Sequence, residues 1–267
     1  MTTRSVHASH QEFPQLVKPF SEKPGSLSDR QAHLWWTSPD QFTDQDELDR
    51  YRALLTEDER QKIDGFRFAA DRHLTLISRV LVRTTLSRYG CIPAERWRFS
   101  RNDHGRPEIA SPVSTLRFNL SHTRGLVTCL VSREKTVGVD VEPCDREGRW
   151  LELADRFFSV REAEALRRIA ESERPQRFLE YWTLKESYIK ARGLGLAIPL
   201  RNFSFDLPTT TPDDVRMHID GAINDQPARW QFGLYSLGKR HLVATAVERE
   251  AGTSTRIATH ETVGPLA

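Results

Sequence analysis

The feature that most constrains the fold is a pattern that occurs twice: a long helical segment, a short strand, and two alternating strands. The segment "LRFNLSH…GLVTCLV" at 116–131 resembles "RWQFGLYS…HLVATAV" at 229–247. Phe118 aligns with Phe232, and the leucine two positions further on is present in both copies. Such repeats are supersecondary units that stack against one another. The pattern therefore predicts two similar α/β halves of about 100 residues each.

Two long helical segments belong to these repeats. "AADRHLTLISRVLVRTTLSRYG" carries an apolar stripe through Leu74, Ile77 and Leu81, and "RPQRFLEYWTLKESYIKARGLG" is its counterpart in the second copy. Residues three and four apart share one helix face, and a glycine is a common helix terminator. The N-terminal segment is polar and contains several prolines, and the C-terminal segment has the composition of a tail. We expect a flexible arm over 1–32, an N-terminal half over 33–136, a C-terminal half over 137–248 and a tail over 249–267.

Composition excludes several classes of protein. The 267 residues are 38% hydrophobic and 28% charged, and no run reaches the roughly 18 apolar residues that a membrane span needs. The first residues lack the apolar core of a signal peptide. The three cysteines form no CxxC pair, and the net charge of +2 argues against a broad nucleic-acid surface. We therefore expect a cytoplasmic protein that binds neither membrane nor nucleic acid.

The segment "VGVDVE" at 137–142 is a strand with two acids on one face. Strand side chains alternate, so the three valines share one face, and Gly138, Asp140 and Glu142 share the other. Neighbouring carboxylates repel each other unless a proton, a cation or a basic side chain lies between them. A hard ion such as Mg²⁺ suits oxygen ligands of this kind. The alternative is a solvated strand end whose acids pair with arginines.

A helix supplies a third carboxylate. Trp182, Glu186 and Lys190 are spaced four apart and share one face, which Lys185 flanks. A metal-phosphate site needs such a carboxylate beside a lysine. The alternatives are a surface salt bridge between Glu186 and Lys190 and a tryptophan that packs in the core.

Two loops add polar groups. In "FNLSH", Ser121 and His122 arrive where a core-facing strand turns, and His122 is either an anion ligand or a hydrogen-bonding turn residue. In "RNDHGRPEI", Arg101 and Arg106 lie on either side of a turn and are placed to clamp a phosphate.

Together these segments resemble one family. "HGRPEI", "FNLSHT", "VGVDVE", "FFSVRE" and "WTLKESYIKARGLGL" occur in the order and spacing of the 4′-phosphopantetheinyl transferases. The resemblance is to the large monomeric type that includes the surfactin-synthetase-activating enzyme, and it spans roughly residues 33 to 248. It implies an α/β (α+β) fold, a pseudo-twofold dimer of two similar halves with the active site in the cleft between them.

The resemblance also implies a reaction. The family moves the 4′-phosphopantetheine arm of coenzyme A onto a serine of an apo-acyl or apo-peptidyl carrier protein and releases adenosine 3′,5′-bisphosphate. By resemblance, Mg²⁺ is held by Asp140, Glu142 and Glu186. Asp140, Glu186 and Lys190 are the catalytic residues implied, with Glu186 the favoured base and Lys190 stabilising the transition state.

The coenzyme A contacts follow from the same motifs. The resemblance implies that Ser121 and His122 bind the phosphates of coenzyme A and that Arg106 lies near the nucleotide. It also implies that Arg101 and Lys62 hold the 3′-phosphate. Another member has lysine where this chain has Glu59, so the clamp must differ in part, and Arg67 or Arg72 is a hypothetical replacement. Glu162 follows Ser159 in a capping-box pattern that already explains it. The expected coenzyme A ligands are Lys62, Arg101, Arg106, Ser121, His122, Lys185 and Lys190.

Two rival functions follow from the same residues. A magnesium-dependent phosphohydrolase acting on coenzyme A or nucleotides would use water in place of the serine, but no additional general base is evident. A non-catalytic carrier-binding protein would be expected to lack an acid or Lys190, and all four groups are present. The carrier and its pathway stay open. Arginines between 156 and 168 either meet an acidic carrier surface or solvate a helix.

Overall fold

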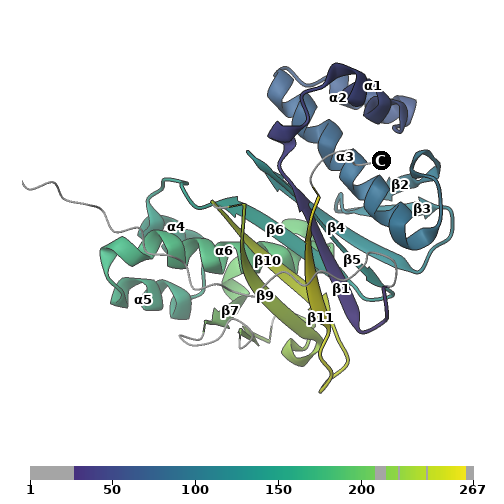
Figure 1. Cartoon of the computed structure of the whole chain (residues 1–267). Helices are drawn as coiled ribbons and strands as arrows, with labels where there is room; N and C mark the ends of the chain where they lie inside the picture. The colour runs from purple at the N-terminus through teal and green to yellow at the C-terminus, as the bar shows by residue number, and fades with distance from the viewer. Residues whose placement is uncertain (1–26, 208–214, 222, 239, 263–267) are drawn as a thin grey trace, which may run out of the picture.

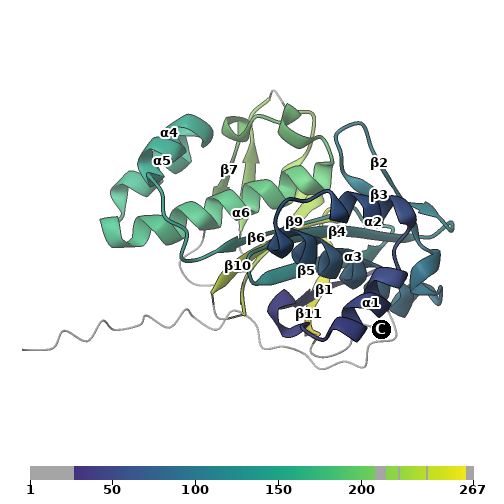
Figure 2. The same ribbon diagram turned by 90° about the horizontal axis from the view of Figure 1, so that it is seen from above.

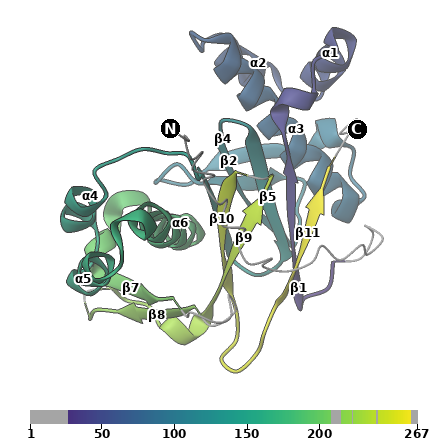
Figure 3. The same ribbon diagram turned by 60° about the vertical axis from the view of Figure 1, so that its left-hand side comes forward.

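The computed structural model describes residues 27–207, 215–221, 223–238 and 240–262, so most of the expected N-terminal arm lies outside the described residues. The strands of the two larger sheets form the middle of the molecule, and the helices within residues 45–90 and those within residues 150–192 lie on different sides of them (Figures 1 and 3). No helix in these described ranges is long and apolar enough to cross a membrane.

The same order of elements occurs twice: a strand, three helices, a short hairpin, and two further strands. The first copy consists of β1 (Gln31–Thr37), α1 (Gln45–Ala53), α2 (Glu57–Asp64), α3 (Ala69–Gly90), β2 (Arg98–Arg101), β3 (Pro107–Ser111), β4 (Leu116–Thr123) and β5 (Leu126–Arg133). The second consists of β6 (Val137–Pro143), α4 (Trp150–Phe157), α5 (Val160–Arg168), α6 (Arg174–Arg192), β7 (Phe203–Asp206), β8 (Arg216–Ile219), β9 (Trp230–Leu237) and β10 (His241–Glu248). A last strand, β11 (Arg256–Glu261), follows.

Short 3-10 helices occur in the connections. They span Pro39–Gln41, Ala94–Arg96, Glu171–Glu173, Gly195–Ala197, Leu200–Asn202 and Pro227–Arg229.

The two larger sheets have matching strand orders. One has the order β11-β1-β5-β4 and the other β6-β10-β9, while β2–β3 and β7–β8 are separate hairpins. The first strand of each copy pairs antiparallel with the last strand of that copy: β1 with β5, and β6 with β10. α3 packs on the first sheet and α6 on the second (Figure 2). The repeat seen in the sequence therefore corresponds to a repeat of topology.

Apolar side chains form three clusters. One lies between α3 and the first sheet, and another between α6 and the second sheet. The third joins the two sheets, where Val137, Val139 and Val141 pack with residues such as Leu130 and Val243. The valine face of "VGVDVE" is therefore core, as its alternation predicts.

Helix ends follow the expected chemistry with one difference. Gly193 ends α6 in the left-handed conformation, at φ 63°. α3 runs through Gly90, and Cys91 takes the left-handed conformation instead, at φ 50°. A Cβ on Gly90 would lie 2.8 Å from the Trp97 ring, so this glycine permits close packing and does not cap the helix.

The expected C-terminal tail contains a strand. β11 pairs in parallel with β1, with Ala32 opposite Ile257 and Leu34 opposite Thr259. Ala258 is buried in this pairing. The polar composition of the segment predicted a tail. The strand was not predicted because its partner lies at the other end of the chain, and local sequence patterns do not indicate such distant pairing. β11 covers an edge of the first sheet that would otherwise present unpaired backbone groups.

Candidate active site

The site lies at the seam between the two large sheets, where β4 runs beside β6 (Figure 2). Side chains of β4 take the place of a backbone ladder at this seam. The Val139 amide donates to Asn119 Oδ1 at 3.0 Å, and the Val141 amide donates to Ser121 Oγ at 3.3 Å. Both amides are buried, so these acceptors satisfy donors that would otherwise be costly. The seam thus joins the two halves through polar side chains.

Gly138 lets α6 lie directly against β6. A Cβ at this position would come within 2.0 Å of the Ser187 carbonyl oxygen and 2.5 Å of the Ala191 amide nitrogen. Both atoms belong to the backbone of α6. The glycine therefore brings the polar face of β6, with Asp140 and Glu142, next to the helix that carries Glu186 and Lys190.

Asp140, Ser121 and Lys190 form a hydrogen-bonded cluster. Lys190 Nζ lies 2.6 Å from Asp140 Oδ1 and 2.8 Å from Ser121 Oγ, and Ser121 Oγ donates to Asp140 Oδ1 at 3.1 Å. Asp140 is only 6% exposed, and its Oδ2 is buried without a hydrogen-bond partner in the described part of the chain. A buried carboxylate oxygen without a partner favours the binding of a cation or a donor.

Two further carboxyls lie near this cluster. Burial and the charges of Asp140 and Glu142 raise the pKa of Glu186 to about 7, although Lys190 opposes the shift. Burial and then Asp140 raise the pKa of Glu142, against the opposing charge of Arg146. Three acids therefore share a volume in which their charges are insufficiently compensated.

Basic side chains hold two of these acids. Lys190 pairs with Asp140, not with Glu186 as the surface salt-bridge alternative required. Arg146 pairs with Glu142 at 2.9 Å and lies over the Trp182 ring. In the described ranges no group of three or more His, Cys, Asp or Glu side chains is arranged to hold a metal ion.

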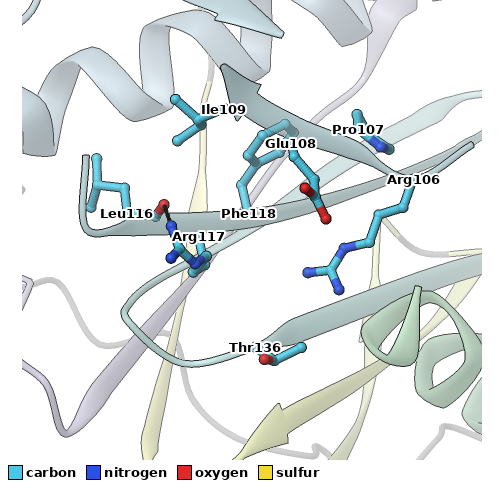
Figure 4. A pocket seen from close by; sticks show the side chains of 8 residues that line it. All are labelled: Arg106, Pro107, Glu108, Ile109, Leu116, Arg117, Phe118 and Thr136. Atoms are coloured by element: carbon cyan, nitrogen blue, oxygen red, sulfur yellow. Dashed lines mark hydrogen bonds between the residues drawn. The ribbon is translucent and has the colours of Figure 1, made fainter. Parts of the chain in front are cut away.

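A pocket of about 270 Å³ opens in front of α6. One wall is the turn between β2 and β3 with Arg106, and the other is the end of α6 with Glu186 and Lys190. Arg106 also lines a neighbouring pocket of about 360 Å³, in which Arg106, Glu108 and Thr136 face one another (Figure 4). Burial lowers the pKa of Arg106.

The other expected ligands lie further out. His122 is exposed at the end of β4, and partial desolvation, followed by the charges of Lys190 and Arg79, lowers its pKa. Arg101 is exposed and donates to the Gly105 carbonyl at 3.0 Å. Lys62 is exposed on α2 and lines a separate pocket with Glu59 and the Arg83 side chain. The structure thus brings Ser121, Asp140, Glu142, Glu186 and Lys190 together, with Arg106 at the pocket wall and His122 near Lys190.

Glu59 and its neighbouring arginines have structural partners. Glu59 closes a capping box with Thr56 and pairs with the fully buried Arg83. Arg72 donates to the carbonyls of Phe66 and Arg67, and Arg67 lies over the Phe68 ring. Neither arginine lines the pocket with Glu186, so nothing in their contacts supports the hypothetical clamp.

Lys185 does not reach the site, which contradicts its expected role in coenzyme A binding. Its side chain is fully buried, and its ammonium lies 2.8 Å from Glu162 Oε2 and donates to the Leu200 and Phe203 carbonyls. Burial lowers the pKa of Lys185, and Glu162 opposes the shift. Residues 185 and 186 point to different sides of α6 because adjacent helix positions are about 100° apart. The capping box of Glu162 and Ser159 is present as expected, and the ion pair is an additional role.

Glu162→Gln is expected to destabilise the fold by about 3 to 5 kcal/mol, because it leaves the buried Lys185 ammonium without its counter-charge. Glutamine can still accept in the capping box, but its NH₂ group cannot also accept from the buried Phe205 amide, which donates to Glu162 Oε1 at 3.1 Å. The loss therefore includes this hydrogen bond as well as the ion pair. Urea unfolding measures the difference. Glu164→Gln, which removes a surface pair with Arg168, is the matched control and should change stability little. Equal stabilities of Glu162→Gln and Glu164→Gln would contradict the role of this pair.

Two residues at the site were not predicted. Asn119 lies two positions before Ser121, so strand alternation places both on the seam face, and that period was the available signal. Arg146 follows the strand in a loop, where no periodicity indicates its direction. Trp182 packs in the aromatic cluster of Phe157 and Phe178, which agrees with the core alternative.

Family models and known proteins match both halves of the chain in sequence. The family model of the 4′-phosphopantetheinyl transferase superfamily matches residues 136–246, and the model "4′-phosphopantetheinyl transferase, N-terminal" matches residues 41–135. 4′-Phosphopantetheinyl transferase Sfp of Bacillus subtilis is 33% identical over 67% of this chain and 74% of its own. 4′-Phosphopantetheinyl transferase HetI of Nostoc is 34% identical over 70% and 78%. L-aminoadipate-semialdehyde dehydrogenase-phosphopantetheinyl transferase of Rattus norvegicus is 27% identical over 82% and 73%.

Proposed function

Because the chain belongs to the 4′-phosphopantetheinyl transferase superfamily, and so transfers phosphopantetheine to carrier proteins, we propose that its chemistry takes place at the seam of β4, β6 and α6. The observation that carries this assignment is the cluster of Ser121, Asp140 and Lys190 beside Glu186. Residues from both halves meet there, and a pocket opens onto it.

We propose Mg²⁺ as the cofactor. Carboxylate oxygens are its preferred protein ligands, and one of them, Asp140 Oδ2, is buried without a hydrogen-bond partner among the described residues. We infer that Asp140, Glu142 and Glu186 would hold the ion. When bound, it would offset the negative charge of the coenzyme A pyrophosphate and of the leaving phosphate.

The protein's own groups account for the remaining chemistry. The serine oxygen of the carrier forms a bond to the phosphorus that bears the pantetheine arm, and the bond from that phosphorus to adenosine 3′,5′-bisphosphate breaks. Glu186 takes the serine proton, directly or through a water molecule, because it is the carboxyl of the three that lines the pocket. Lys190 lies where its ammonium can neutralise charge on the transferred phosphate.

The nucleotide end would occupy the pocket between the β2–β3 turn and α6. Ser121 and His122 would contact phosphates, and Arg106 would lie beside the nucleotide. Arg101 and Lys62 do not line this pocket, and Lys62 lines a separate one; both are proposed as 3′-phosphate contacts because their basic side chains are exposed. This placement uses the charges of the site without requiring Lys185.

We also propose that the halves 33–136 and 137–248 are related by an approximate twofold axis, with the active site in the cleft between them. The repeated element order and the matching strand orders β1-β5-β4 and β6-β10-β9 support this relation. One chain then supplies both walls of the cleft, which favours a monomer. A cytoplasmic location remains a prediction from the sequence.

We do not propose the arginines of α5 as a binding surface for the carrier protein. Arg161 pairs with Asp206, Arg167 with Asp155, and Arg168 with Glu164 on the surface. These pairs favour the solvating alternative for this helix face.

Transfer can be tested directly. The purified protein is incubated with coenzyme A, Mg²⁺ and apo-carriers from fatty-acid, polyketide and peptide synthetases, and mass spectrometry follows addition of the phosphopantetheine arm. We expect at least one carrier to be modified and none to be modified after chelation of the metal. Breakdown of coenzyme A without modification of any carrier would instead support the phosphohydrolase, which the transferase relatives do not favour.

A further inference from the structure

The turn between β2 and β3 is bonded to the end of α6, although the two belong to different halves. Asn102 Nδ2 donates to the Gly193 carbonyl at 2.8 Å. Arg106 Nη1 donates to the Ala191 carbonyl at 2.5 Å. These carbonyls lie at the C-terminal end of a helix, where acceptors lack intrahelical partners and the helix dipole is negative. Both donors are therefore well matched to their acceptors.

Asn102 also organises its own turn. Its Oδ1 accepts from the His104 amide at 3.0 Å and from the Arg106 amide at 2.9 Å. The Gly105 amide donates to the Asn102 carbonyl at 2.9 Å. The Asn102 carboxamide thus accepts hydrogen bonds within the turn through its oxygen and donates one to α6 through its nitrogen. A carboxamide offers this combination on a short side chain.

The glycine at the helix end permits this approach. Gly193 has a φ of 63°, and a Cβ there would lie 2.8 Å from Arg106 Cδ and 3.1 Å from Asn102 Nδ2. Any larger residue would separate the turn from the helix. The contact therefore requires the left-handed glycine that also ends α6.

This contact joins the two walls of the pocket. His104, Gly105 and Arg106 form one wall, and the last turns of α6, with Glu186 and Lys190, form the other. We propose that Asn102 is a positioning residue that sets the separation of these walls and so the affinity for coenzyme A. This inference rests on the proposed function, because it takes the pocket to be the nucleotide site.

Asn102→Asp is the informative variant. It keeps the size and the acceptor that hold the turn, but it removes the donor and sets a carboxylate against the negative end of α6. We expect the KM for coenzyme A to rise about tenfold, in line with the loss of a hydrogen bond and an added repulsion. We expect kcat to change by less than about twofold, because Glu186 and Lys190 stay in place once substrate is bound.

A second readout does not depend on activity. Hydrogen exchange of the amides around residues 191–195 should become faster in Asn102→Asp, since the end of α6 loses its anchor. Asn102→Ser, whose hydroxyl still accepts from the turn but is too short to reach Gly193, should give the same two effects if Asn102→Asp folds poorly. Asn202→Asp, with the same charge change in the Leu200–Asn202 turn, is the control and should leave both readouts unchanged.

Gly193→Ala tests the contact from the other side. It should raise the same KM, and combined with Asn102→Asp it should add less than the sum of the two effects, because both variants disrupt one contact. Full additivity, an unchanged KM, or a kcat that falls as far as KM rises would overturn the positioning role. Calorimetric titration of coenzyme A separates the two hypotheses. If the wild-type protein binds coenzyme A but modifies no carrier, only the proposed function is contradicted. If Asn102→Asp has the same affinity for coenzyme A and the same hydrogen-exchange rates as the wild type, only the role of Asn102 is contradicted.

Discussion

Asp140→Asn is expected to reduce transfer by about a thousandfold while the protein stays folded. The amide keeps the shape of the carboxyl and can still accept from Ser121. It removes the negative charge opposite Lys190, and it replaces the buried Oδ2, the strongest candidate for a metal ligand. Transfer of the phosphopantetheine arm to an apo-carrier, measured by mass spectrometry at saturating coenzyme A and Mg²⁺, checks this result.

The matched control is Asp145→Asn. Asp145 is exposed just beyond β6 and lies 3.6 Å from Arg124, so its loss tests a nearby carboxylate outside the cluster. Its transfer rate should stay close to that of the wild type. Magnesium binding, measured by titration calorimetry, should weaken in Asp140→Asn and not in Asp145→Asn. Near-normal transfer by Asp140→Asn would exclude the seam as the catalytic site, whatever the family of the protein.

Gly138→Ala is expected to lower the free energy of unfolding by about 3 kcal/mol or more. The added methyl group would meet the Ser187 carbonyl at 2.0 Å and the Ala191 amide at 2.5 Å. Both are backbone atoms of α6, which cannot rotate away as a side chain can. The helix would have to move from β6 and carry Glu186 and Lys190 with it. Activity should therefore fall even at temperatures where the variant is folded.

Urea unfolding followed by fluorescence measures the loss. Gly221→Ala is the control, because nothing lies within 4 Å of a Cβ there, and its unfolding free energy should change by less than about 0.5 kcal/mol. Wild-type stability of Gly138→Ala would mean that α6 does not lie against β6 as closely as the structure has it.

Local patterns predicted most of the secondary structure. The apolar stripe of 69–90 became α3, the alternation of "VGVDVE" became a strand with a buried valine face, and Ser159 with Glu162 closed the expected capping box. These features depend on residues a few positions apart, and such residues constrain one another directly. The strand β11 was missed because its partner is β1, near the other end of the chain.

The residues of the candidate site were predicted only where local spacing determines their positions. Spacing placed Glu186 and Lys190 on one face of a helix, and the acids of β6 on one face of a strand. Spacing alone did not predict that Lys185 points away from the site, because it does not tell which side of the helix packs in the core and which side borders the site. Nor did it indicate that Arg146 pairs with Glu142, or that Asn102 reaches Gly193 across the pocket.

Periodicity, caps and motifs are properties of neighbouring residues, so they were enough to predict most of the elements, their repeated order and the family, but not the strand β11. Which charged groups meet follows from the three-dimensional packing of the chain. Lys190 faces Asp140 in the seam and Lys185 faces Glu162 in the core, although the two lysines are only five positions apart. The physical reason is that burial and Coulomb interactions act through space, so the partner of a charge depends on how α6 lies against β6 and α5.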